Sequence, residues 1–422
     1  MFYDVCIVGG GAAGLMASIF AARNGASVGV IERNTAVGRK LLRTGRGRCN
    51  ITHDGSVNQF VQAYDFCGRF LKHSLYGFSP ADTIEFFAKL GVKSKIEKDG
   101  QVFPVSDNAA TVKNALLQDA QRLGVKFIYG RRVESIVKDE SGFTITAEPD
   151  TIKSVSVIIA TGGKSWSALG STGDGYKLAE KFGHTIIKPV PALTGLSADG
   201  DWSGRLQGVA IPEVKVSSKI GGKKIVSTGP MMFTDKGIGG PAVFEFTRFA
   251  AEGLADIKDS IDVCLDLYPA LSNDDFRKRF QDMTAANPKK KVLSYLSDFL
   301  PARLAEILFA RIDIPEKTPF GQLAKKKRQR LIEIIKHLQI PITSTTGFKQ
   351  ATITRGGVDT KEIDPKTMQS KIIPGLYFAG EVINADGPCG GYNLQIAWST
   401  GALAAKNASQ KKAAEPEKIP PL

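Results

Sequence analysis

The sequence predicts an α/β protein with a small β-rich unit and a basic helical stretch in its middle, and three observations predict it. First, an apolar run from Phe2 to Val8 leads into a glycine turn, Gly9 to Gly14, and then a helical stretch from Leu15 to Asn24. Second, short β-prone runs punctuated by Gly and Pro follow Ala192. Third, helical periodicity with Lys and Arg on the polar positions runs from Phe276 to Ile340. The chain has 422 residues, of which 42% are apolar, so two or three structural units are expected.

The remaining elements follow from local periodicity. Ser27 to Ile31 completes a strand, turn, helix, strand opening, and helical periodicity recurs from Ala109 to Leu123. The other expected strands are Lys126 to Tyr129, Arg132 to Lys138, Phe143 to Ala147, Val155 to Ala160, Glu213 to Ser217 and Lys224 to Val226. The last 15 or so residues, rich in Ala, Lys, Glu and Pro, are expected to form a loose tail.

Composition argues against several classes of protein. The longest apolar runs, such as Val155 to Ala160, are far below the roughly 20 residues that cross a bilayer, and no leader precedes the first strand, so we expect a cytoplasmic protein. The five cysteines include no CxxC pair, which argues against a disulfide framework, a zinc site or a redox dithiol. The four histidines show no ligand spacing, so no metal is expected.

The glycine turn has the features of a dinucleotide-binding site. Gly9, Gly11 and Gly14 fit G-x-G-x-x-G, and Ala12 and Ala13 complete the turn between a strand and a helix, where backbone N–H groups and the helix dipole favour a pyrophosphate. Glu32 ends the second strand, where a carboxylate can accept hydrogen bonds from ribose hydroxyls. An adenosine with a free 2′-OH is implied.

A segment near the C-terminus favours FAD over NAD as the resident dinucleotide. Pro374 to Glu381 resembles the strand-plus-acid element with which flavoproteins of the type with two dinucleotide-binding domains contact the ribityl chain. Gly237 to Ala242 loosely matches G-x-G-x-x-A, but the apolar run before it is short and Pro241 suits a first helical turn. We therefore expect NADH or NADPH as electron donor without a separate binding domain.

At these residues the chain resembles the YhiN/BaiN-type family of FAD-dependent oxidoreductases, from Asp4 to about Ala405. The motifs that carry the resemblance are Gly38 to Leu42, Gly45 to Thr52, Ala160 to Gly163, Gly170 to Gly175, Phe233 to Pro241 and Gly390 to Gln395. Two departures are Gly45-Arg46-Gly47, where a serine before the glycines is commoner, and Ile238-Gly239, where Leu-Ser is usual.

The resemblance implies a discontinuous Rossmann-like FAD-binding domain interrupted by a β-rich domain that carries a helical subdomain. The boundaries are then 1–191 and 341–407 for the two parts of the FAD-binding domain, 192–275 for the β-rich domain, 276–340 for the basic helical insert and 408–422 for the tail. Besides the glycine turn and Glu32, the cofactor residues implied are Arg33, Lys40, Gly47, Arg48, Cys49, Asn50, Val133, Thr161, Gly162, Gly163, Gly173, Asp174, Gly380, Glu381, Gly391, Tyr392, Asn393, Leu394 and Gln395.

Three groups of residues suggest roles in the reaction. The loop Gly38 to Thr52 carries five cations and no acid, which can neutralise phosphates and stabilise an anionic reduced flavin. Asn393 and Gln395 lie in a Gly-rich turn before an Ala-rich helix, where backbone N–H groups and side-chain amides could address the flavin pyrimidine edge. Cys389 is the first candidate for a general acid because an unperturbed thiol is mostly protonated at neutral pH, and Tyr392 is the alternative.

Members of the family are linked to three substrate classes: uridine in large-subunit ribosomal RNA, steroid-like enones such as bile acids, and small amines such as aminoacetone. The net charge of +14 favours a polyanionic partner, and Phe276 to Ile340 holds 15 Lys or Arg against 6 Asp or Glu. Two clusters supply the charge: Lys289, Lys290 and Lys291, then Lys325, Lys326, Lys327, Arg328 and Arg330. The sequence therefore favours ribosomal RNA as partner and an RNA uridine reductase, with an amine oxidase or enone reductase as the alternative.

Overall fold

The computed structural model describes residues 1–200, 202–256 and 258–410, which divide into two compact units. The first unit joins Met1–Pro189 to the segment that starts at Ile353, and the second is Val190–Thr352. The chain leaves the first unit in β10 (Ile186–Ala192) and returns at β17 (Ile353–Val358). The first unit is thus built from both ends of the sequence.

A mixed sheet forms the centre of the first unit. Its strands are β1 (Phe2–Val8), β2 (Val28–Glu32), β6 (Lys126–Tyr129), β7 (Ser135–Asp139), β8 (Gly142–Ala147), β9 (Asp150–Ile159) and β18 (Leu376–Phe378). The order is β6-β2-β1-β9-β8-β7, and β18 pairs with the C-terminal part of β9, beyond the residues that pair with β8. β6, β2, β1, β9 and β18 are parallel, whereas β8 and β7 are antiparallel. The predicted α/β class is confirmed.

Helices and short elements complete the first unit. The helices are α1 (Ala12–Arg23), α2 (Val57–Ala63), α3 (Gly68–Gly77), α4 (Pro80–Lys89), α5 (Ala109–Arg122), α6 (Asp174–Glu180) and α13 (Tyr392–Ala408). The 3-10 segments are η1 (Leu41–Gly47), η2 (Asp65–Cys67), η3 (Ser167–Leu169), η5 (Thr360–Glu362) and η6 (Gly380–Val382), and η1 is interrupted by a kink from Thr44 to Arg46. A small antiparallel sheet has the order β3 (Thr52–His53), β5 (Gln101–Pro104) and β4 (Ser94–Ile96).

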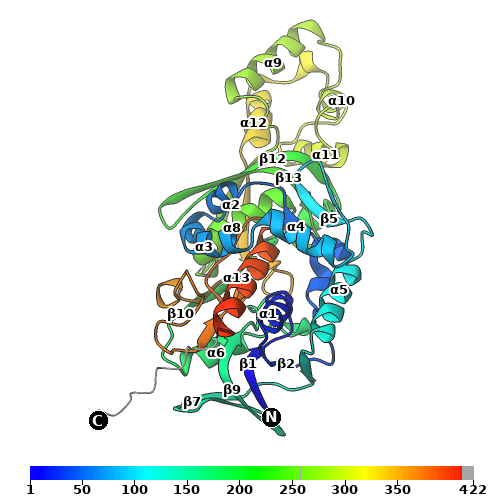
Figure 1. Ribbon diagram of the computed structural model, residues 1–422. Helices are drawn as coiled ribbons and strands as arrows, with labels where there is room; N and C mark the ends of the chain where they lie inside the picture. Colours follow the sequence, from blue (N-terminus) through cyan, green and yellow to red (C-terminus); the bar gives the residue numbers. More distant parts are fainter. Residues whose placement is uncertain (201, 257, 411–422) are drawn as a thin grey trace, which may run out of the picture. The chain divides into compact units, whose positions relative to one another are not determined.

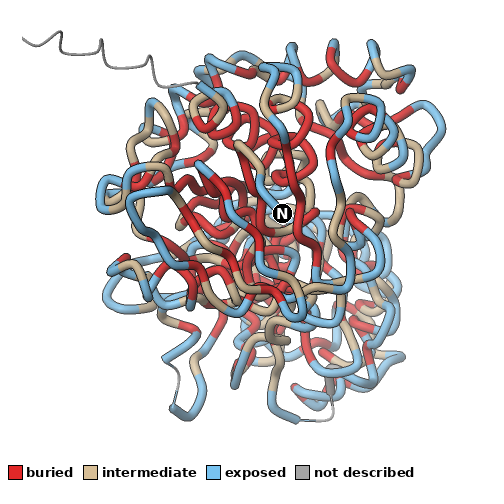
Figure 2. Tube along the Cα trace, turned by 60° about the horizontal axis from the view of Figure 1, so that its bottom comes forward, coloured by how far each residue is buried: buried red, intermediate tan, exposed pale blue. Residues whose placement is uncertain are grey.

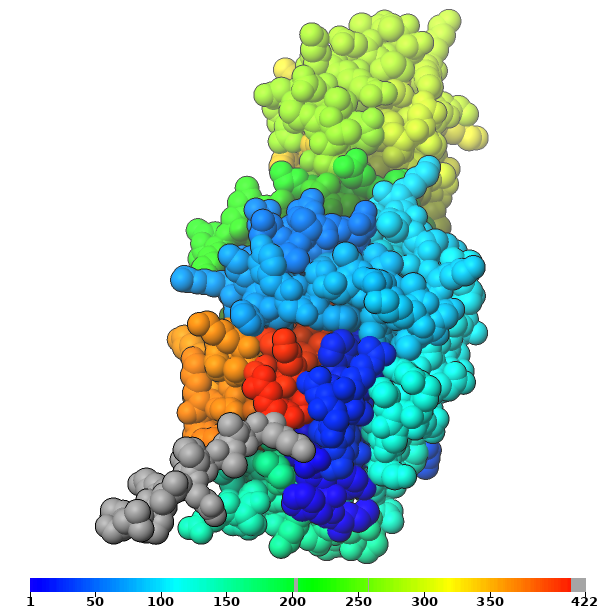
Figure 3. Space-filling model, viewed as in Figure 1, coloured from blue at the N-terminus to red at the C-terminus, as the bar shows by residue number. Residues whose placement is uncertain are grey.

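The first helix and the last helix of the structure pack against each other, although they come from opposite ends of the chain. Figure 1 and Figure 3 show α1 in blue beside α13 in red. A Cβ added at Gly401 of α13 would lie 2.6 Å from the carbonyl oxygen of Ala13, so the contact is backbone to backbone. Most residues of α1 are buried, as expected for a helix covered on two sides. Buried residues lie in the middle of the chain trace, and exposed residues gather at its outer loops (Figure 2).

The second unit is organised around a closed antiparallel barrel. The strands are β11 (Leu196–Ala198), β12 (Ala210–Ile220), β13 (Lys223–Phe233), β14 (Gly237–Gly239), β15 (Ile261–Asp266) and β16 (Leu338–Thr345), in the order β11-β14-β13-β12-β15-β16. β12 and β13 extend well beyond the predicted runs because they pair with each other along their length. The helices α7 (Trp202–Arg205) and α8 (Pro241–Ala255) lie between barrel strands in the sequence, and α8 buries Val243 and Phe246 in the core of the unit.

A helical insert separates β15 from β16. It consists of α9 (Asn273–Ala286), α10 (Val292–Leu296), α11 (Ala302–Arg311), η4 (Phe320–Gln322) and α12 (Lys325–Lys336). Its apolar side chains belong to the same core cluster as those of the barrel. Lys336, which is buried, pairs with Asp266 at 2.8 Å and donates to the carbonyl oxygens of Tyr268 and Leu271, so α12 is fastened to the end of β15.

The expected domain boundaries stay predictions, but two positions in the structure bear on them. The expected boundary between the helical insert and the second part of the FAD-binding domain, after residue 340, falls inside β16, since Ile340 and Pro341 both pair with β15. α13 continues to Ala408, and most of the expected tail lies outside the described residues. Within the part of the chain that is described, no helix is both long and apolar enough to span a membrane.

Candidate functional site

The glycine turn between β1 and α1 gives each of its motif glycines a different physical role. Gly9 has φ +104°, and a Cβ there would lie 2.6 Å from the carbonyl oxygen of Ala160. A Cβ at Gly14 would lie 1.9 Å from the carbonyl oxygen of Gly9, because α1 packs directly on the turn. At Gly11, by contrast, no atom lies within 4 Å of such a Cβ. The turn is tightly packed at two positions and open at the third, which is what close approach of a pyrophosphate to the backbone requires.

The N-terminus of α1 faces the same opening with unsatisfied donors. Gly11 is the N-cap and no side chain caps the helix. The N–H groups of its first turn, including those of Ala12 and Ala13, have no intrahelical acceptor. Together with the positive end of the helix dipole they form an anion site suited to a diphosphate.

Glu32 is buried and holds the turn in place. Its Oε2 accepts a hydrogen bond from the Gly10 N–H at 2.8 Å, and its Oε1 accepts from the backbone and side-chain nitrogens of Asn34 at 2.8 and 2.7 Å. A carboxylate has about four acceptor positions, so one remains for a ribose hydroxyl. The sequence predicted the ribose contact but not the bond to Gly10, which only the folded turn brings into reach.

Arg33 and Asp174 contact each other. Arg33 donates to Asp174 at 2.9 Å and to Thr172 at 2.6 Å, and Arg132 forms a second ion pair with Asp174 at 2.6 Å. Burial alone would raise the pKa of Asp174, but the hydrogen bonds and charges of the two arginines outweigh it and lower the pKa. These pairs tie the end of β2 to the segment before α6, beside the place where an adenosine on Glu32 would lie.

The segment after β18 closes the site from the other end of the chain. A Cβ at Gly380, where φ is +74°, would lie 2.8 Å from the Cβ of Ala13, so Glu381 follows directly after a contact with the first turn of α1. Glu381 pairs with Lys40 at 2.6 Å and accepts from the Thr354 N–H at 2.7 Å. The carboxylate also lies beside Gly163, whose added Cβ would be 3.2 Å from Glu381 Cδ. Five predicted positions, Gly380, Glu381, Lys40, Gly163 and Ala13, are thus brought together.

Buried polar atoms without a partner provide a test of whether this region fits a polar cofactor. Asn50 Oδ1, Thr161 Oγ1 and the Tyr176 hydroxyl are buried and accept or donate no hydrogen bond within the described residues. Such atoms cost about 1–3 kcal/mol each unless a ligand or water satisfies them. Asn50 and Thr161 were predicted cofactor residues, and one amide oxygen with two hydroxyl groups fits the many hydrogen-bonding groups of FAD. Tyr176, whose pKa is raised by burial, was missed, although it follows the predicted Gly173 and Asp174.

The remaining predicted residues of this region, Gly162, Gly173 and Val133, shape the backbone or pack in the core. Gly162 and Gly173 have φ +71° and +80°, and the Gly173 N–H donates to the Gly163 carbonyl oxygen at 3.1 Å, which folds the loop before α6 back on itself. Val133 is buried in the core between β6 and β7.

The loop Gly38 to Thr52 carries less uncompensated charge than its sequence suggested. Arg48 pairs with Glu97 at 2.7 Å and with Asp107 at 3.5 Å, and its guanidinium lies 3.7 Å from the centre of the Phe103 ring. Lys40, as described, pairs with Glu381. Cys49 is buried, and burial raises the pKa of its thiol to about 12, so it stays protonated. Gly47 has φ +87°, which lets the loop turn before Arg48.

The start of α13, directly after the glycine turn, carries two side-chain amides, and both form hydrogen bonds within the protein. The fully buried Gln395 amide accepts from Thr52 and Thr83 and donates to the Phe78 carbonyl oxygen and to Ser399. Asn393 exchanges hydrogen bonds with Gly387 and also donates to Pro388. Both amides are therefore occupied within the protein. Contacts from this motif to a flavin would come from backbone N–H groups at the start of α13, where Gly391 is the N-cap with φ +96° and Leu394 lies in the first turn.

The two candidate proton donors occupy distinct surroundings. Cys389 is exposed. Tyr392 is half-buried, stacks on His53 at 4.9 Å between ring centres, and also contacts Phe60 at 4.7 Å. Burial raises the pKa of Tyr392, so the phenol keeps its proton throughout the neutral range. His53 Nδ1 lies 3.1 Å from the Gly390 carbonyl oxygen, which anchors the turn that holds both candidates.

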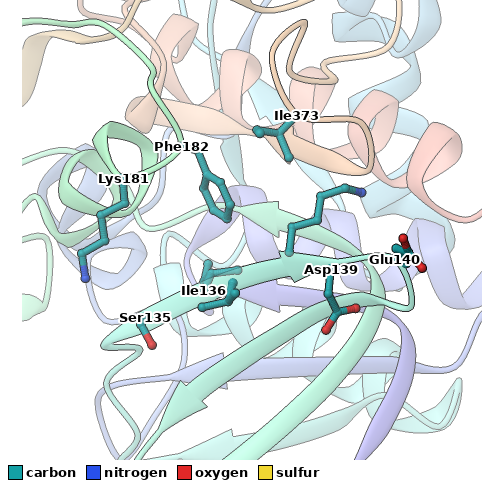
Figure 4. A pocket seen from close by; sticks show the side chains of 9 residues that line it. Ser135, Ile136, Asp139, Glu140, Lys181, Phe182 and Ile373 are labelled. Atoms are coloured by element: carbon teal, nitrogen blue, oxygen red, sulfur yellow. The ribbon is translucent and has the colours of Figure 1, made fainter.

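Other features of the structure lie apart from these residues. A hollow of about 890 Å³ beside edge strand β7 is lined by side chains that include Ile136, Lys181, Phe182 and Ile373 and by none of the predicted site residues (Figure 4). The G-x-G-x-x-A match starts within β14 itself, and β14 is antiparallel to both its neighbours, so the match does not open a second nucleotide fold. Among the described residues, no three His, Cys, Asp or Glu side chains are grouped to hold a metal ion.

Comparisons with known proteins agree with this geometry. The family model described as HI0933-like protein Rossmann domain matches residues 3–407. The 3-dehydro-bile acid delta(4,6)-reductase of Clostridium scindens is 36% identical, over 96% of this chain and 98% of the relative. The ribosomal RNA dihydrouridine synthase of Escherichia coli is 32% identical over the same shares. The structure of a 3-ketosteroid-delta4-(5alpha)-dehydrogenase from Rhodococcus jostii has a TM-score of 0.51 at 16% identity and covers 97% of each chain, which shows a shared fold.

Proposed function

The chain belongs to the HI0933-like Rossmann family, and from that premise we propose that it reduces uridine to dihydrouridine in large-subunit ribosomal RNA with NADH or NADPH as electron donor. It is an FAD-dependent oxidoreductase, and the family resemblance drawn from its motifs is confirmed. An enzyme with this substrate works where ribosomes are assembled, so the cytoplasmic location expected from the sequence is part of the proposal.

The two full-length relatives point to one type of reaction. Their names describe reduction of a bile-acid double bond and formation of dihydrouridine. Each change adds a hydride and a proton across a carbon–carbon double bond that is conjugated with a carbonyl group. When bound, FAD supplies the hydride after taking it from the nicotinamide donor. The protein must supply the proton and hold the acceptor in place.

The proposal of RNA rather than a small molecule as substrate rests on exposed basic residues of the helical insert. Lys325, Lys326 and Arg330 on α12 are exposed, as are Lys289 and Lys291 before α10, and none of the five has an ion pair within the described chain. Lys290 and Lys327 differ, because they pair with Asp298 and Asp313.

The position of these charges on α12 is itself unfavourable for stability. Lys325, Lys326 and Lys327 form the first turn, at the positive end of the helix dipole, where each cation costs about 0.3–1 kcal/mol. A bound polyanion would relieve this repulsion, whereas a steroid or a small amine gains nothing from it. The cluster therefore supports a phosphate-rich substrate.

Residues of the turn before α13 provide the proton in this proposal. The exposed Cys389 thiol is the first candidate, and the Tyr392 hydroxyl, held by stacking on His53, is the second. Lys40 and Glu381 fix the segment after β18 against the loop Gly38 to Thr52 and so shape the cofactor site.

Replacing the cluster Lys325, Lys326, Lys327 and Arg328 by Ala tests the proposal. RNA binding should weaken, and its salt dependence should become shallower by up to about 0.9 in log K per log salt for each phosphate that the protein no longer neutralises. Reduction of the flavin by NADPH should not change. The matched control replaces four lysines of the β12–β13 hairpin, Lys215, Lys219, Lys223 and Lys224, by Ala. Equal losses in both variants, or none in either, would contradict an RNA-binding role of the insert.

Reduction of a steroid enone is the second candidate, because the bile-acid reductase is the relative with 36% identity. Turnover of a 3-keto-4-ene steroid with NADPH, without dihydrouridine formation in ribosomal RNA, would favour it. The amine oxidase considered from the sequence would instead be recognised by fast reoxidation in air with release of peroxide.

A further inference from the structure

The 3-10 turn η2 braces the turn that carries Cys389. The Cys67 thiol donates to the carbonyl oxygen of Asp386 at 3.3 Å, and the Tyr64 hydroxyl donates to the carbonyl oxygen of Tyr392 at 2.8 Å. Between them Asp65 adopts φ +50°, a left-handed conformation that is uncommon for a non-glycine residue. Residues 64–67 are therefore held at both ends against the segment 386–392.

This brace presents an aromatic side chain to solvent. Phe66 is 45% exposed, although its neighbours Tyr64 and Cys67 are buried. A phenylalanine stabilises a protein through the part of its ring that is buried, so the exposed part of the Phe66 ring adds nothing to the core. An exposed ring on a rigid turn beside a candidate catalytic residue requires another explanation.

Arg355 covers one side of the Phe66 ring. Its guanidinium carbon lies 4.5 Å from the ring centre, and its Nη1 lies 3.6 Å from Oδ1 of the buried Asp386. The Arg355 side chain is only 14% exposed, so it is fixed between the ring and the carboxylate. The exposed area of Phe66 therefore belongs to the part of the ring that Arg355 does not cover.

The surroundings of Phe66 are charged. Asp65 precedes it, and α3, which begins directly after η2, exposes Arg69 and Lys72. A steroid needs a broad apolar wall, which a single ring among charged side chains does not form. A planar nucleobase needs one aromatic face, and the phosphates beside it need cations.

We propose that Phe66, backed by Arg355, is a platform on which a base of single-stranded RNA stacks, next to the segment 386–392 that carries Cys389. The proposal rests on the proposed function, since it names the contact that would hold the RNA near the proton donor. Stacking supplies affinity for any base because every base has a π-face, so the platform holds the strand and leaves recognition of the target uridine to other contacts.

The test compares Phe66→Ala and Phe66→Trp in the flavin-loaded protein, with a labelled single-stranded oligouridine as probe. Loss of one base–aromatic stack should weaken binding about tenfold or more in Phe66→Ala, and tryptophan should restore it. The salt dependence should not change, because no cation is removed from a phosphate. The control is Phe249→Ala: Phe249 is 42% exposed and lies under the Arg248 guanidinium at 5.0 Å, but on α8.

The outcomes separate this proposal from the proposed reaction. Absence of oligouridine binding to the wild-type protein, unchanged affinity in Phe66→Ala, or an equal loss in Phe249→Ala would overturn the platform, even if the wild-type protein forms dihydrouridine. Weaker binding confined to Phe66→Ala supports the platform, even if no dihydrouridine forms and the proposed reaction fails. Flavin content should be the same in all variants, so a folding defect would be detected.

Discussion

Substituting Gly11 by Val separates cofactor binding from folding at a single position. Gly11 has φ −78° and ψ −168°, an extended conformation that valine adopts readily, and a Cβ there meets no atom within 4 Å. The new side chain would therefore enter the open space at the N-terminus of α1 without a clash. It would occupy the place where a pyrophosphate must approach the backbone.

The expected magnitude follows from the hydrogen bonds that the valine side chain would prevent. A hydrogen bond from a backbone N–H to a charged oxygen contributes about 1.5–3 kcal/mol. Removal of two such bonds at the first turn of α1 corresponds to a decrease in FAD affinity of about 100-fold or more. The effect on folding should be much smaller, about 1 kcal/mol for replacing an N-cap glycine by a β-branched residue.

The assay is the ratio of flavin to protein absorbance after purification, together with circular dichroism. Gly11→Val should purify folded and colourless. The control Gly77→Val, at an exposed glycine that also meets nothing within 4 Å, should purify folded and yellow. Gly14→Val should not fold, because its Cβ would overlap the Gly9 carbonyl oxygen. A folded Gly11→Val protein with full flavin content would refute the assignment of this turn to the cofactor.

Three further predictions concern the same site. Glu32→Ala should lower flavin content more than Glu32→Gln, because the glutamine amide oxygen can still accept a hydrogen bond from the Gly10 N–H. The ratio of flavin to protein absorbance measures the flavin content, and equal content in both variants would show that the hydrogen bonds of Glu32 do not matter. Removing FAD should lower the melting temperature, since ligand at about 100 times its Kd adds about 2.7 kcal/mol of stability, and equal melting curves for both forms would contradict tight binding. Cys389→Ala should slow uridine reduction by about 10²-fold and leave flavin reduction intact. A loss below about threefold would transfer the proton-donor role to Tyr392, whose pKa is raised by burial, so rates should then stay flat throughout the neutral range and fall only at alkaline pH.

Local chemistry made the nucleotide turn predictable from the sequence. The spacing of Gly9, Gly11 and Gly14 between an apolar strand and a helix determines the backbone conformation within a few residues. Only the helix start was placed late, at Leu15 rather than Ala12, because the small residues of the turn carry no apolar periodicity although they already belong to the helix.

Contacts between distant segments were not predictable in the same way. The acids that neutralise Arg48 lie about 50 or more positions further along the chain, at Glu97 and Asp107, so the loop appeared more cationic in the sequence than it is. Gln395 illustrates the same limit, because its amide is satisfied by Thr52, Thr83 and the Phe78 carbonyl oxygen, which only the fold brings together. Tyr176 was missed because an unsatisfied hydroxyl can be recognised only once its burial is known.

The dihydrouridine content of large-subunit ribosomal RNA from a strain that lacks this gene tests the proposed reaction in the cell. We predict that at least one dihydrouridine present in the parent strain is replaced by uridine in the deletion strain. The wild-type gene should restore it, whereas the Gly11→Val gene should not. An unchanged set of dihydrouridines in the deletion strain would contradict the proposed reaction and favour the reduction of a small enone instead.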